Sequence, residues 1–295
     1  MSNKKPYRGR FAPSPSGALH FGSLIAALGS YLQAKSQQGS WQVRIDDIDP
    51  PREVHGAAQD ILQTLQAYGL NWDGDVIYQS TRSRSYEQLL AKLSDLNLSY
   101  ACACTRKIIK LQGGLYRGTC RNKHLAQHKH ALRINLHNLA QPVTHFHDRL
   151  QGDVYLNALE ATEDFIIKRK DGFYAYNLAV VIDDIYQGIT EVVRGSDLLS
   201  TTGKQISLYK LLNVQEPDYI HLPVAVTAPG LKLSKQNHAL AIDKENPVPT
   251  LLKALDFLGQ PAPLAMHTQD CSKILDWAVK NWSLSSIPKK SEIKI

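Results

Sequence analysis

The stretch PSPSGALHFGSLIAAL, residues 13–28, places two prolines, two glycines and a histidine directly before an apolar helical pattern. The prolines hold the backbone extended, while Gly17 and Gly22 leave room for another backbone or a ligand. The helix that follows begins with free N–H groups and the positive end of its dipole, which suits a phosphate. His20 and Ser23 add donors at the same point. The stretch therefore indicates either a nucleotide pocket at the carboxyl edge of a parallel sheet or a plain proline-rich turn.

Alternating strand and helix patterns surround this stretch. Strand-like segments are YRGRFAP, WQVRIDD, DVIYQS and, much later, HLPVAVT. Apolar spacing predicts helices at about Phe21–Gln37, Val54–Tyr68, Ser83–Asn97 and Thr202–Leu212. This alternation predicts an α/β fold, a parallel sheet with helices on both faces.

Four segments are expected along the chain. Residues 1–99 and 143–245 are predicted to form the two halves of a nucleotide-binding domain, because both carry the alternating pattern. Residues 100–142 break that rhythm and are predicted to be an insertion. Residues 246–295 form a short helical C-terminal region, of which 262–295 carry no pattern that predicts a structure.

Composition bounds the class of protein. Of the 295 residues, 43% are hydrophobic and 21% charged, which is typical of a soluble globular chain. The net charge of +7 suits a polyanionic partner such as nucleic acid, although a merely basic surface would give the same value. The sequence has no apolar run long enough to cross a bilayer and no signal-peptide pattern at its start. We therefore expect a cytoplasmic protein with no membrane partner.

Three of the four cysteines lie close together in the insertion. Cys102, Cys104 and Cys120 are too closely grouped for ordinary disulfides and indicate a metal, since thiolates suit tetrahedral zinc. Spacing alone nominates His124 as the fourth ligand. Three buried cysteines without a metal are the alternative.

A second basic motif lies in the other half of the chain. In LKLSKQN, residues 231–237, Lys232 and Lys235 flank a Leu-Ser pair in a loop that follows a strand and Gly230. Lysines on such a loop can neutralise the charge that develops on a triphosphate as it splits. A solvated basic turn is the alternative.

Together, HFGS and KLSKQ resemble the paired His-x-Gly-His and Lys-Met-Ser-Lys-Ser signatures of class I aminoacyl-tRNA synthetases. PSPSGALHFGS and RIDDIDPPR are similar to the glutamyl branch of that class, and the resemblance covers roughly residues 7–245. Only about fifty residues follow Asn246, too few for the helical anticodon-binding region of glutamyl-tRNA synthetases. The chain thus resembles their truncated paralogues, the glutamyl-queuosine tRNA(Asp) synthetases.

This resemblance implies a Rossmann-like class I catalytic domain with a zinc-bearing insertion. It implies a ligase that activates L-glutamate with ATP to glutamyl-adenylate, then transfers the glutamate to the queuosine base at the wobble position of tRNA(Asp). The implied partners are L-glutamate, ATP with Mg²⁺ and tRNA(Asp) carrying queuosine. The rivals are a shortened glutamyl-tRNA synthetase charging the 3′ end of a tRNA, a nucleotidyl transferase for a small molecule, and a non-catalytic RNA-binding module.

The resemblance also implies the site residues. Those for glutamate are Arg10, Phe11, Ala12, Pro13, Ser14, Asp46, Tyr176 and Arg194. Those for ATP are His20, Gly22, Ser23, Lys232 and Lys235, with His20 and Lys235 as the catalytic residues. The implied zinc ligands are Cys102, Cys104, Tyr116 and Cys120, so the resemblance favours Tyr116 over His124.

Two of these residues raise specific expectations. Arg194 is expected to grip the side-chain carboxylate of glutamate in bidentate fashion. The alternative for Arg194 is an internal salt bridge with Asp183, Asp184 or Asp197. Asp46 stands where the family pattern has a glutamate that contacts the substrate ammonium, so we expect a water bridge or a small backbone shift to fill the gap.

Overall fold

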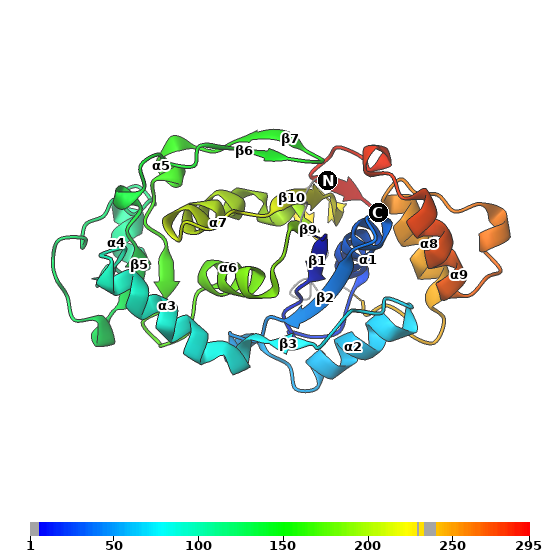
Figure 1. Ribbon diagram of the computed structural model, residues 1–295, viewed down its shortest axis with the longest axis horizontal. Helices are drawn as coiled ribbons and strands as arrows, with labels where there is room; N and C mark the ends of the chain where they lie inside the picture. The colour runs from blue at the N-terminus through cyan, green and yellow to red at the C-terminus, as the bar shows by residue number, and fades with distance from the viewer. Residues whose placement is uncertain (1–5, 229, 233–239) are drawn as a thin grey trace.

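The computed structural model describes residues 6–228, 230–232 and 240–295. Its centre is formed by two parallel sheets, β3-β2-β1 and β9-β10, which lie side by side with β1 next to β9 (Figure 1). The strands are β1 (Arg8–Phe11), β2 (Ser40–Ile45), β3 (Ile77–Tyr78), β9 (Glu191–Gly195) and β10 (Asp218–Leu222). The two halves meet where the N–H of Thr190 donates to the carbonyl of Arg8 at 3.0 Å. The parallel sheet expected from the sequence is therefore built from segments on either side of the insertion.

Helices cover both faces of this sheet, as the alternating pattern predicted. They are α1 (Phe21–Ser36), α2 (Ala57–Ala67), α6 (Tyr176–Gln187) and α7 (Leu199–Leu211), while α3 (Ser83–Asp95) packs against α6 and β4. On β1, Gly9 faces α1, where a Cβ would lie 3.4 Å from Ala34. The next residue, Arg10, points to the opposite face and bonds to Asp184 on α6. The expected helices are found with ends shifted by a few residues.

The residues of the expected insertion and a strand that follows it form a separate antiparallel sheet. Its strands are β4 (Ser99–Cys102), β5 (Ala131–Ile134) and β8 (Ile166–Lys168), with α4 (Arg106–Leu111) and the one-turn α5 (Ala158–Ala161) nearby. A hairpin of β6 (His145–Asp148) and β7 (Gly152–Tyr155) returns toward β10, where the N–H of Arg149 donates to Tyr219. Figure 1 shows the insertion at one end of the molecule and the C-terminal helices at the other.

The C-terminal residues complete the main core. Helices α8 (Pro247–Phe257) and α9 (Cys271–Asn281) pack against α1, and Leu251, Leu255 and Ile274 are fully buried there. Strand β13 (Glu292–Lys294) pairs with β11 (Val224–Ala228), whose other neighbour is β12 (Leu231–Lys232). Within the described ranges, no helix is both long and apolar enough to cross a bilayer.

Candidate active site

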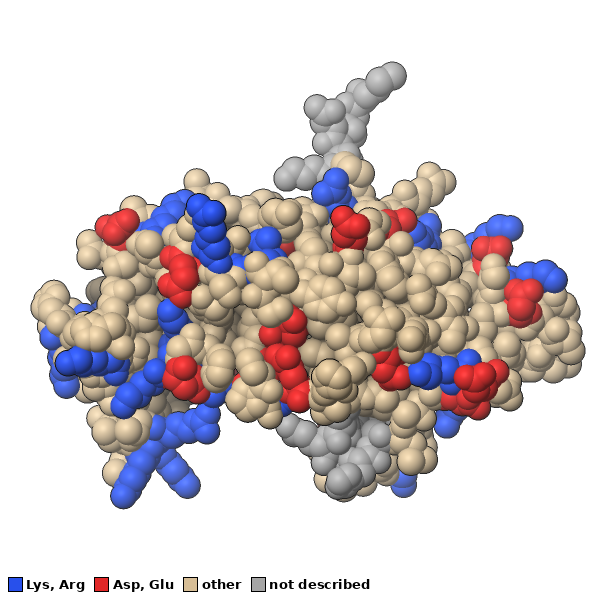
Figure 2. Space-filling model, turned by 90° about the horizontal axis from the view of Figure 1, so that it is seen from below, with Lys and Arg blue, Asp and Glu red and all other residues tan. Residues whose placement is uncertain are grey.

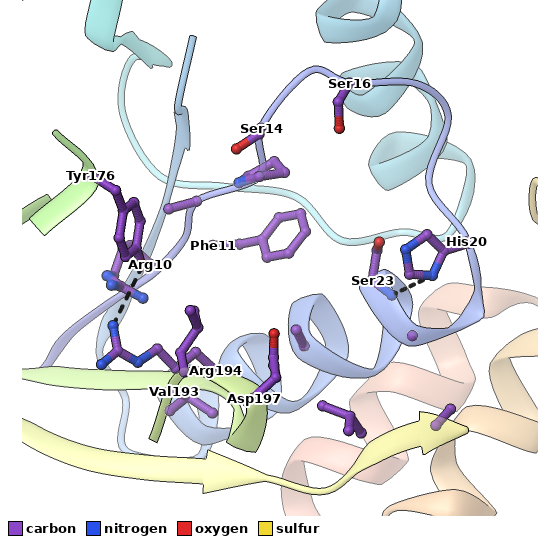
Figure 3. Close-up of a pocket in the computed structure, with 18 residues that line it drawn as sticks. Arg10, Phe11, Ser14, Ser16, His20, Ser23, Tyr176, Val193, Arg194 and Asp197 are labelled. Atoms are coloured by element: carbon purple, nitrogen blue, oxygen red, sulfur yellow. Dashed lines mark hydrogen bonds between the residues drawn. The ribbon is translucent and has the colours of Figure 1, made fainter. Parts of the chain in front are cut away.

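A cavity of about 320 Å³ opens at the carboxyl ends of β1 and β9, over the start of α1 (Figure 3). Its volume is within the usual range for a small-molecule site. Ten sequence-predicted residues line it: Arg10, Phe11, Ala12, Pro13, Ser14, His20, Gly22, Ser23, Tyr176 and Arg194. The fold thus brings most of the residues expected for glutamate, and His20, Gly22 and Ser23 of those expected for ATP, around one cavity.

Arg194 lies at one side of this cavity, at the end of β9. It is 5% exposed, and its Nη1 donates to the hydroxyl of Tyr176 at 3.5 Å. The two aspartates that could have paired with it on α6 have other partners: Asp184 binds Arg10, and Asp183 binds Arg82. The guanidinium and the Tyr176 hydroxyl therefore offer a cationic, hydrogen-bonding corner suited to a carboxylate.

A buried ion network lies behind the cavity. Asp184 accepts two bonds of 3.1 Å from Arg10 and one of 2.7 Å from Arg44. Burial alone would raise the pKa of Asp184, but Arg10 and Arg44 lower it below its usual range. Arg44 also donates from Nε to Asp46 at 2.8 Å. Since Nε and Nη2 of Arg10 are bound to Asp184, these atoms fix Arg10 in place.

Asp46 lines a second cavity, of about 250 Å³, next to the first. Ser14, Ser16 and Tyr176 line both cavities and form the wall between them. Burial raises the pKa of Asp46 to about 6, although Arg44 acts to lower it. At neutral pH the carboxyl is therefore mostly ionised and can attract an ammonium group from the second cavity.

The opposite side of the first cavity is formed by the start of α1. His20 caps the helix, and its Nδ1 accepts the N–H of Ser23 at 3.3 Å. In the neutral ring this leaves the proton on Nε2, so the ring can donate on its other side. Figure 3 shows the His20 ring and the Ser23 hydroxyl together at this helix end. The N-terminus of α1, Gly22 and these two side chains form a place suited to phosphate.

Only part of the lysine loop lies within the described residues. Lys232 ends β12, where its backbone pairs with Val226. Lys235 lies outside the described residues, so its role stays a prediction.

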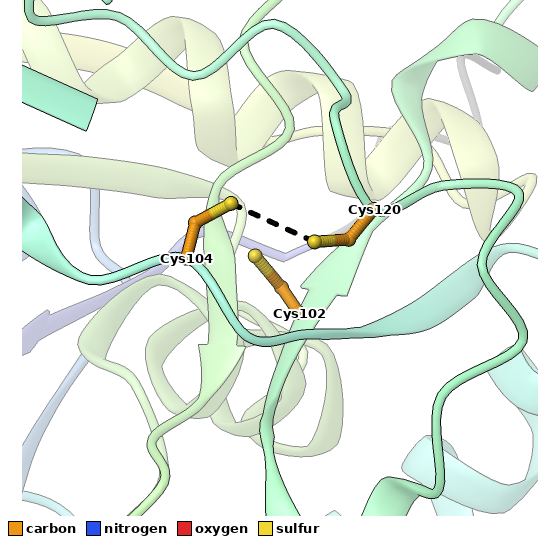
Figure 4. Close-up of side chains that lie close together, drawn as sticks. All are labelled: Cys102, Cys104 and Cys120. Atoms are coloured by element: carbon orange, nitrogen blue, oxygen red, sulfur yellow. Dashed lines mark hydrogen bonds between the residues drawn. The ribbon is translucent and has the colours of Figure 1, made fainter. Parts of the chain in front are cut away.

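The three insertion cysteines converge on one point (Figure 4). The sulfur atoms of Cys102, Cys104 and Cys120 all lie within 4.8 Å of one another. Tyr116 is buried in the same cluster, and its hydroxyl accepts the N–H of Cys120 at 2.8 Å. His124 is exposed and is not among the metal-ligating groups found in the described part of the chain. Three thiols and a neighbouring phenol are a donor set that can hold a tetrahedral metal ion.

Sequence reasoning missed several groups around these cavities. Ser16 lines the first cavity, and Gln79 lines the second. Asp197, considered from the sequence only as an ion-pair partner of Arg194, also lines the first cavity. Behind Arg194, the side chains of His221 and Asp148 form a buried pair. No spacing in the sequence reveals that pair, because its members are 73 residues apart and meet only through the sheet.

Comparison with known proteins agrees with this architecture. Residues 7–248 match the family model described as tRNA synthetases class I (E and Q), catalytic domain. A glutamate tRNA ligase from Elizabethkingia meningosepticum, crystallised in complex with its amino acid, superposes with a TM-score of 0.80 at 22% identity. The superposition covers 97% of this chain and 66% of that one. At this identity it supports the fold alone, which is the class I catalytic fold expected from the sequence.

Closer relatives define the family. The Glutamyl-Q tRNA(Asp) synthetase of Photobacterium profundum is 56% identical over 293 residues, covering 99% of this chain and 94% of that protein. The protein of the same name from Escherichia coli K12 is 56% identical over 287 residues, covering 97% of this chain and 92% of that protein. The chain belongs to the glutamyl-Q tRNA(Asp) synthetase family of class I tRNA synthetases.

Proposed function

We propose that the chain activates L-glutamate with ATP and transfers the glutamyl group to the queuosine base of tRNA(Asp). It is then a ligase that uses ATP and releases AMP and pyrophosphate. One observation carries the proposal: a single cavity joins the cationic corner at Arg194 to the phosphate-binding helix start at His20. The names of the relatives supply the acceptor.

In the activation step, we assign positioning and charge stabilisation to the protein. Arg194 binds the side-chain carboxylate of glutamate and Asp46 its ammonium group, either directly or through water. His20, Ser23 and the N–H groups at the start of α1 bind ATP phosphates, with Mg²⁺ carried by the nucleotide. The glutamate α-carboxylate attacks the α-phosphorus, and the bond to the β-phosphate oxygen breaks. Lys235, helped by Lys232, stabilises the departing pyrophosphate.

In the transfer step, we assign the second cavity to the acceptor base. Queuosine carries hydroxyl groups and a secondary amine, which need acceptors and negative charge. Asp46, Asp49 and Glu53 line this cavity together with Arg52 and Arg169, which both pair with Asp49. Gln79, also in its lining, is fully buried and its Oε1 has no hydrogen-bond partner in the described structure. An acceptor hydroxyl placed here attacks the glutamyl carbonyl where the two cavities meet beside Ser14 and Tyr176. The bond from that carbonyl to the phosphate oxygen breaks, and AMP leaves while the hydroxyl proton passes to its phosphate or to water.

We propose that Cys102, Cys104, Tyr116 and Cys120 hold one structural zinc ion. The convergence of the three sulfurs supports this, and the buried Tyr116 hydroxyl lies nearer to them in the fold than the exposed His124. The ion would fix the loops of the insertion between β4 and β5.

The insertion is also the proposed RNA-contacting part. Residues 100–142 contain lysines and arginines but no aspartate or glutamate. Figure 2 shows Lys and Arg side chains gathered at the end of the molecule that carries the insertion. Such a surface favours binding to the phosphate backbone of a tRNA.

We retain the division of the chain into residues 1–99, 100–142, 143–245 and 246–295 as a proposal. We also propose that the enzyme acts in the cytoplasm, where its tRNA is found.

The experiment follows labelled glutamate on purified tRNA(Asp) with and without queuosine, with tRNA(Glu) as the comparison. Incorporation only into queuosine-containing tRNA(Asp) is expected. Incorporation that ignores queuosine, or that prefers tRNA(Glu), would favour the shortened glutamyl-tRNA synthetase instead. Glutamate-dependent ATP–pyrophosphate exchange, run in parallel with each amino acid, excludes a non-catalytic RNA-binding module if it proceeds.

The acceptor cavity has its own test. Glu53→Gln, at an exposed position, should slow transfer while leaving pyrophosphate exchange unchanged. Glu216→Gln, at a partly exposed position distant in sequence, is the control and should leave both steps unchanged. Equal loss of exchange and transfer in Glu53→Gln would contradict the assignment.

A further inference from the structure

Arg194 is held from behind by a residue on the neighbouring strand. Its partner in the β9–β10 register is His221, and the Nε of Arg194 donates to the Nε2 of His221 at 3.1 Å. The Nη2 of Arg194 donates to the Thr202 hydroxyl at 2.8 Å. Two of the three guanidinium nitrogens are thus bound on the protein side. Nη1, the third, is directed toward Tyr176 and the first cavity (Figure 3).

His221 is in turn held by Asp148, at the end of β6. Their Nδ1 and Oδ2 atoms lie 2.6 Å apart, and both side chains are completely buried. Because an arginine N–H can only donate, the Nε2 of His221 must accept, and the ring proton lies on Nδ1, facing Asp148. Burial lowers the pKa of His221 in spite of Asp148, which keeps the ring neutral. A protonated His221 ring would place a second positive charge and a second N–H donor next to the guanidinium of Arg194, and both would repel it.

We propose that Asp148 and His221 are positioning residues for glutamate recognition, which fix the guanidinium of Arg194 with its Nη1 edge toward the substrate. The inference rests on the proposed role of Arg194 in binding the side-chain carboxylate. A flexible arginine loses rotamer freedom when it binds, so fixing it beforehand strengthens binding. The effect falls on glutamate affinity and selectivity, whereas ATP binds at the other side of the cavity.

Asp148→Asn tests this directly, because the surroundings dictate how the new amide lies. The Oδ1 of Asp148 accepts the backbone N–H groups of Leu150 at 3.0 Å, Gln151 at 2.8 Å and His221 at 3.3 Å. The amide oxygen must keep that place, so the NH₂ group faces the Nδ1 of His221. The ring must then carry its proton on Nε2, which lies 3.1 Å from both the Nε of Arg194 and the Thr202 hydroxyl. The hydroxyl can accept this proton but the N–H of Arg194 cannot, so two donors face each other and the guanidinium loses its Nε partner.

The readouts are ¹⁵N chemical shifts of the His221 ring and the kinetics of glutamate-dependent ATP–pyrophosphate exchange. In Asp148→Asn we expect the ring tautomer to invert and the KM for glutamate to rise at least about tenfold, with the KM for ATP within about twofold. Discrimination against glutamine should also fall. The control is Asp153→Asn on β7. Its Oδ1 lies 2.9 Å from the Nδ1 of His147 at an exposed position, so the same change there should leave both KM values unaltered.

A second pair of variants keeps the test decisive if Asp148→Asn does not fold. Thr202→Val removes the hydroxyl that binds the Nη2 of Arg194 and lies 3.1 Å from the Nε2 of His221, and it should raise the KM for glutamate. Thr202→Ser keeps the hydroxyl and should keep the wild-type value. An inverted tautomer with unchanged glutamate KM would overturn the proposal, as would parallel losses in both KM values. If the wild-type protein shows no glutamate-dependent exchange, that result refutes the proposed function. It does not refute the positioning of Arg194 by His221 and Asp148.

Discussion

Acidification should weaken glutamate binding because Asp46 gains a proton. Asp46 is 6% exposed, and this burial raises its pKa to about 6. The charged groups around it are Arg44 and Arg10, which lower the pKa, and Asp184, which raises it. Below that pKa the carboxyl is neutral and no longer attracts the substrate ammonium group.

The size of the effect follows from the pKa. With a value of about 6, roughly nine in ten Asp46 side chains are ionised at about pH 7 and roughly one in ten at about pH 5. If only the ionised form binds glutamate well, the KM rises about tenfold across that interval. Free glutamate keeps its side-chain charge there, since such carboxyls titrate near ~4.3. The rise in the glutamate KM therefore reflects protonation of the protein and not of the substrate.

The assay is glutamate-dependent ATP–pyrophosphate exchange at saturating Mg-ATP, with the glutamate KM measured at several pH values. Asp46→Asn should give a raised KM at neutral pH that no longer changes on acidification. Asp47→Asn is the matched control, because the Asp47 carboxylate is already bound by Ser80 and lines neither cavity. It accepts the N–H of Ser80 at 2.8 Å and the Ser80 hydroxyl at 2.6 Å. This variant should keep the wild-type pH dependence.

An acidic rise in KM that persists unchanged in Asp46→Asn would refute the assignment. Histidines also titrate in this range, so His20→Asn is measured alongside. If His20→Asn abolishes the rise and Asp46→Asn does not, the pH dependence belongs to the phosphate side of the cavity.

Three further predictions concern the lysine loop, the zinc site and the buried ion network. Lys235→Ala should slow glutamate activation by about 10²–10³-fold, measured by pyrophosphate exchange, with an unchanged melting temperature; a near-normal rate would contradict its role. Tyr116→Phe should lower the zinc content measured by stoichiometric metal assay, whereas His124→Ala should leave it at one per chain; the reverse result would assign the ligand to His124. Asp184→Asn leaves two buried guanidinium groups without their shared carboxylate, which costs about 3–5 kcal/mol. The melting temperature should fall by roughly 10 °C in thermal unfolding, and a fall of a degree or less would show that the network contributes little.

The elements that carry periodic apolar residues could be predicted from the sequence. Helix α1 was expected from its spacing and ends within one residue of the expected position. The parallel sheet was also expected, because each strand is followed by a helical pattern. The family resemblance pointed to His20, Tyr176 and Arg194, and the fold brings all three to one cavity. Their chemical roles stay predictions.

The rest depended on long-range contacts that no local pattern encodes. Strand β13 is three residues long and exists because β11 offers it a free edge. Asp46 could be identified from its motif. Its position in the second cavity depends on Arg44, which is held by Asp184 of α6, 140 residues further along the chain. Arg194 and His221 are 27 residues apart and meet because two strands pair in register.

The packing of the C-terminal residues on the catalytic domain has a consequence for any attempt to shorten the chain. The match to the class I catalytic family ends at residue 248, which suggests a natural place to cut. A chain cut there would lose α9, most of α8 and β13, leaving apolar residues of α1 such as Phe21, whose ring packs edge-on against Phe257, partly uncovered. It would also expose the unpaired edge of β11. An apolar patch beside an open strand edge favours aggregation between molecules, so the smallest well-behaved unit extends past the boundary of the catalytic motifs.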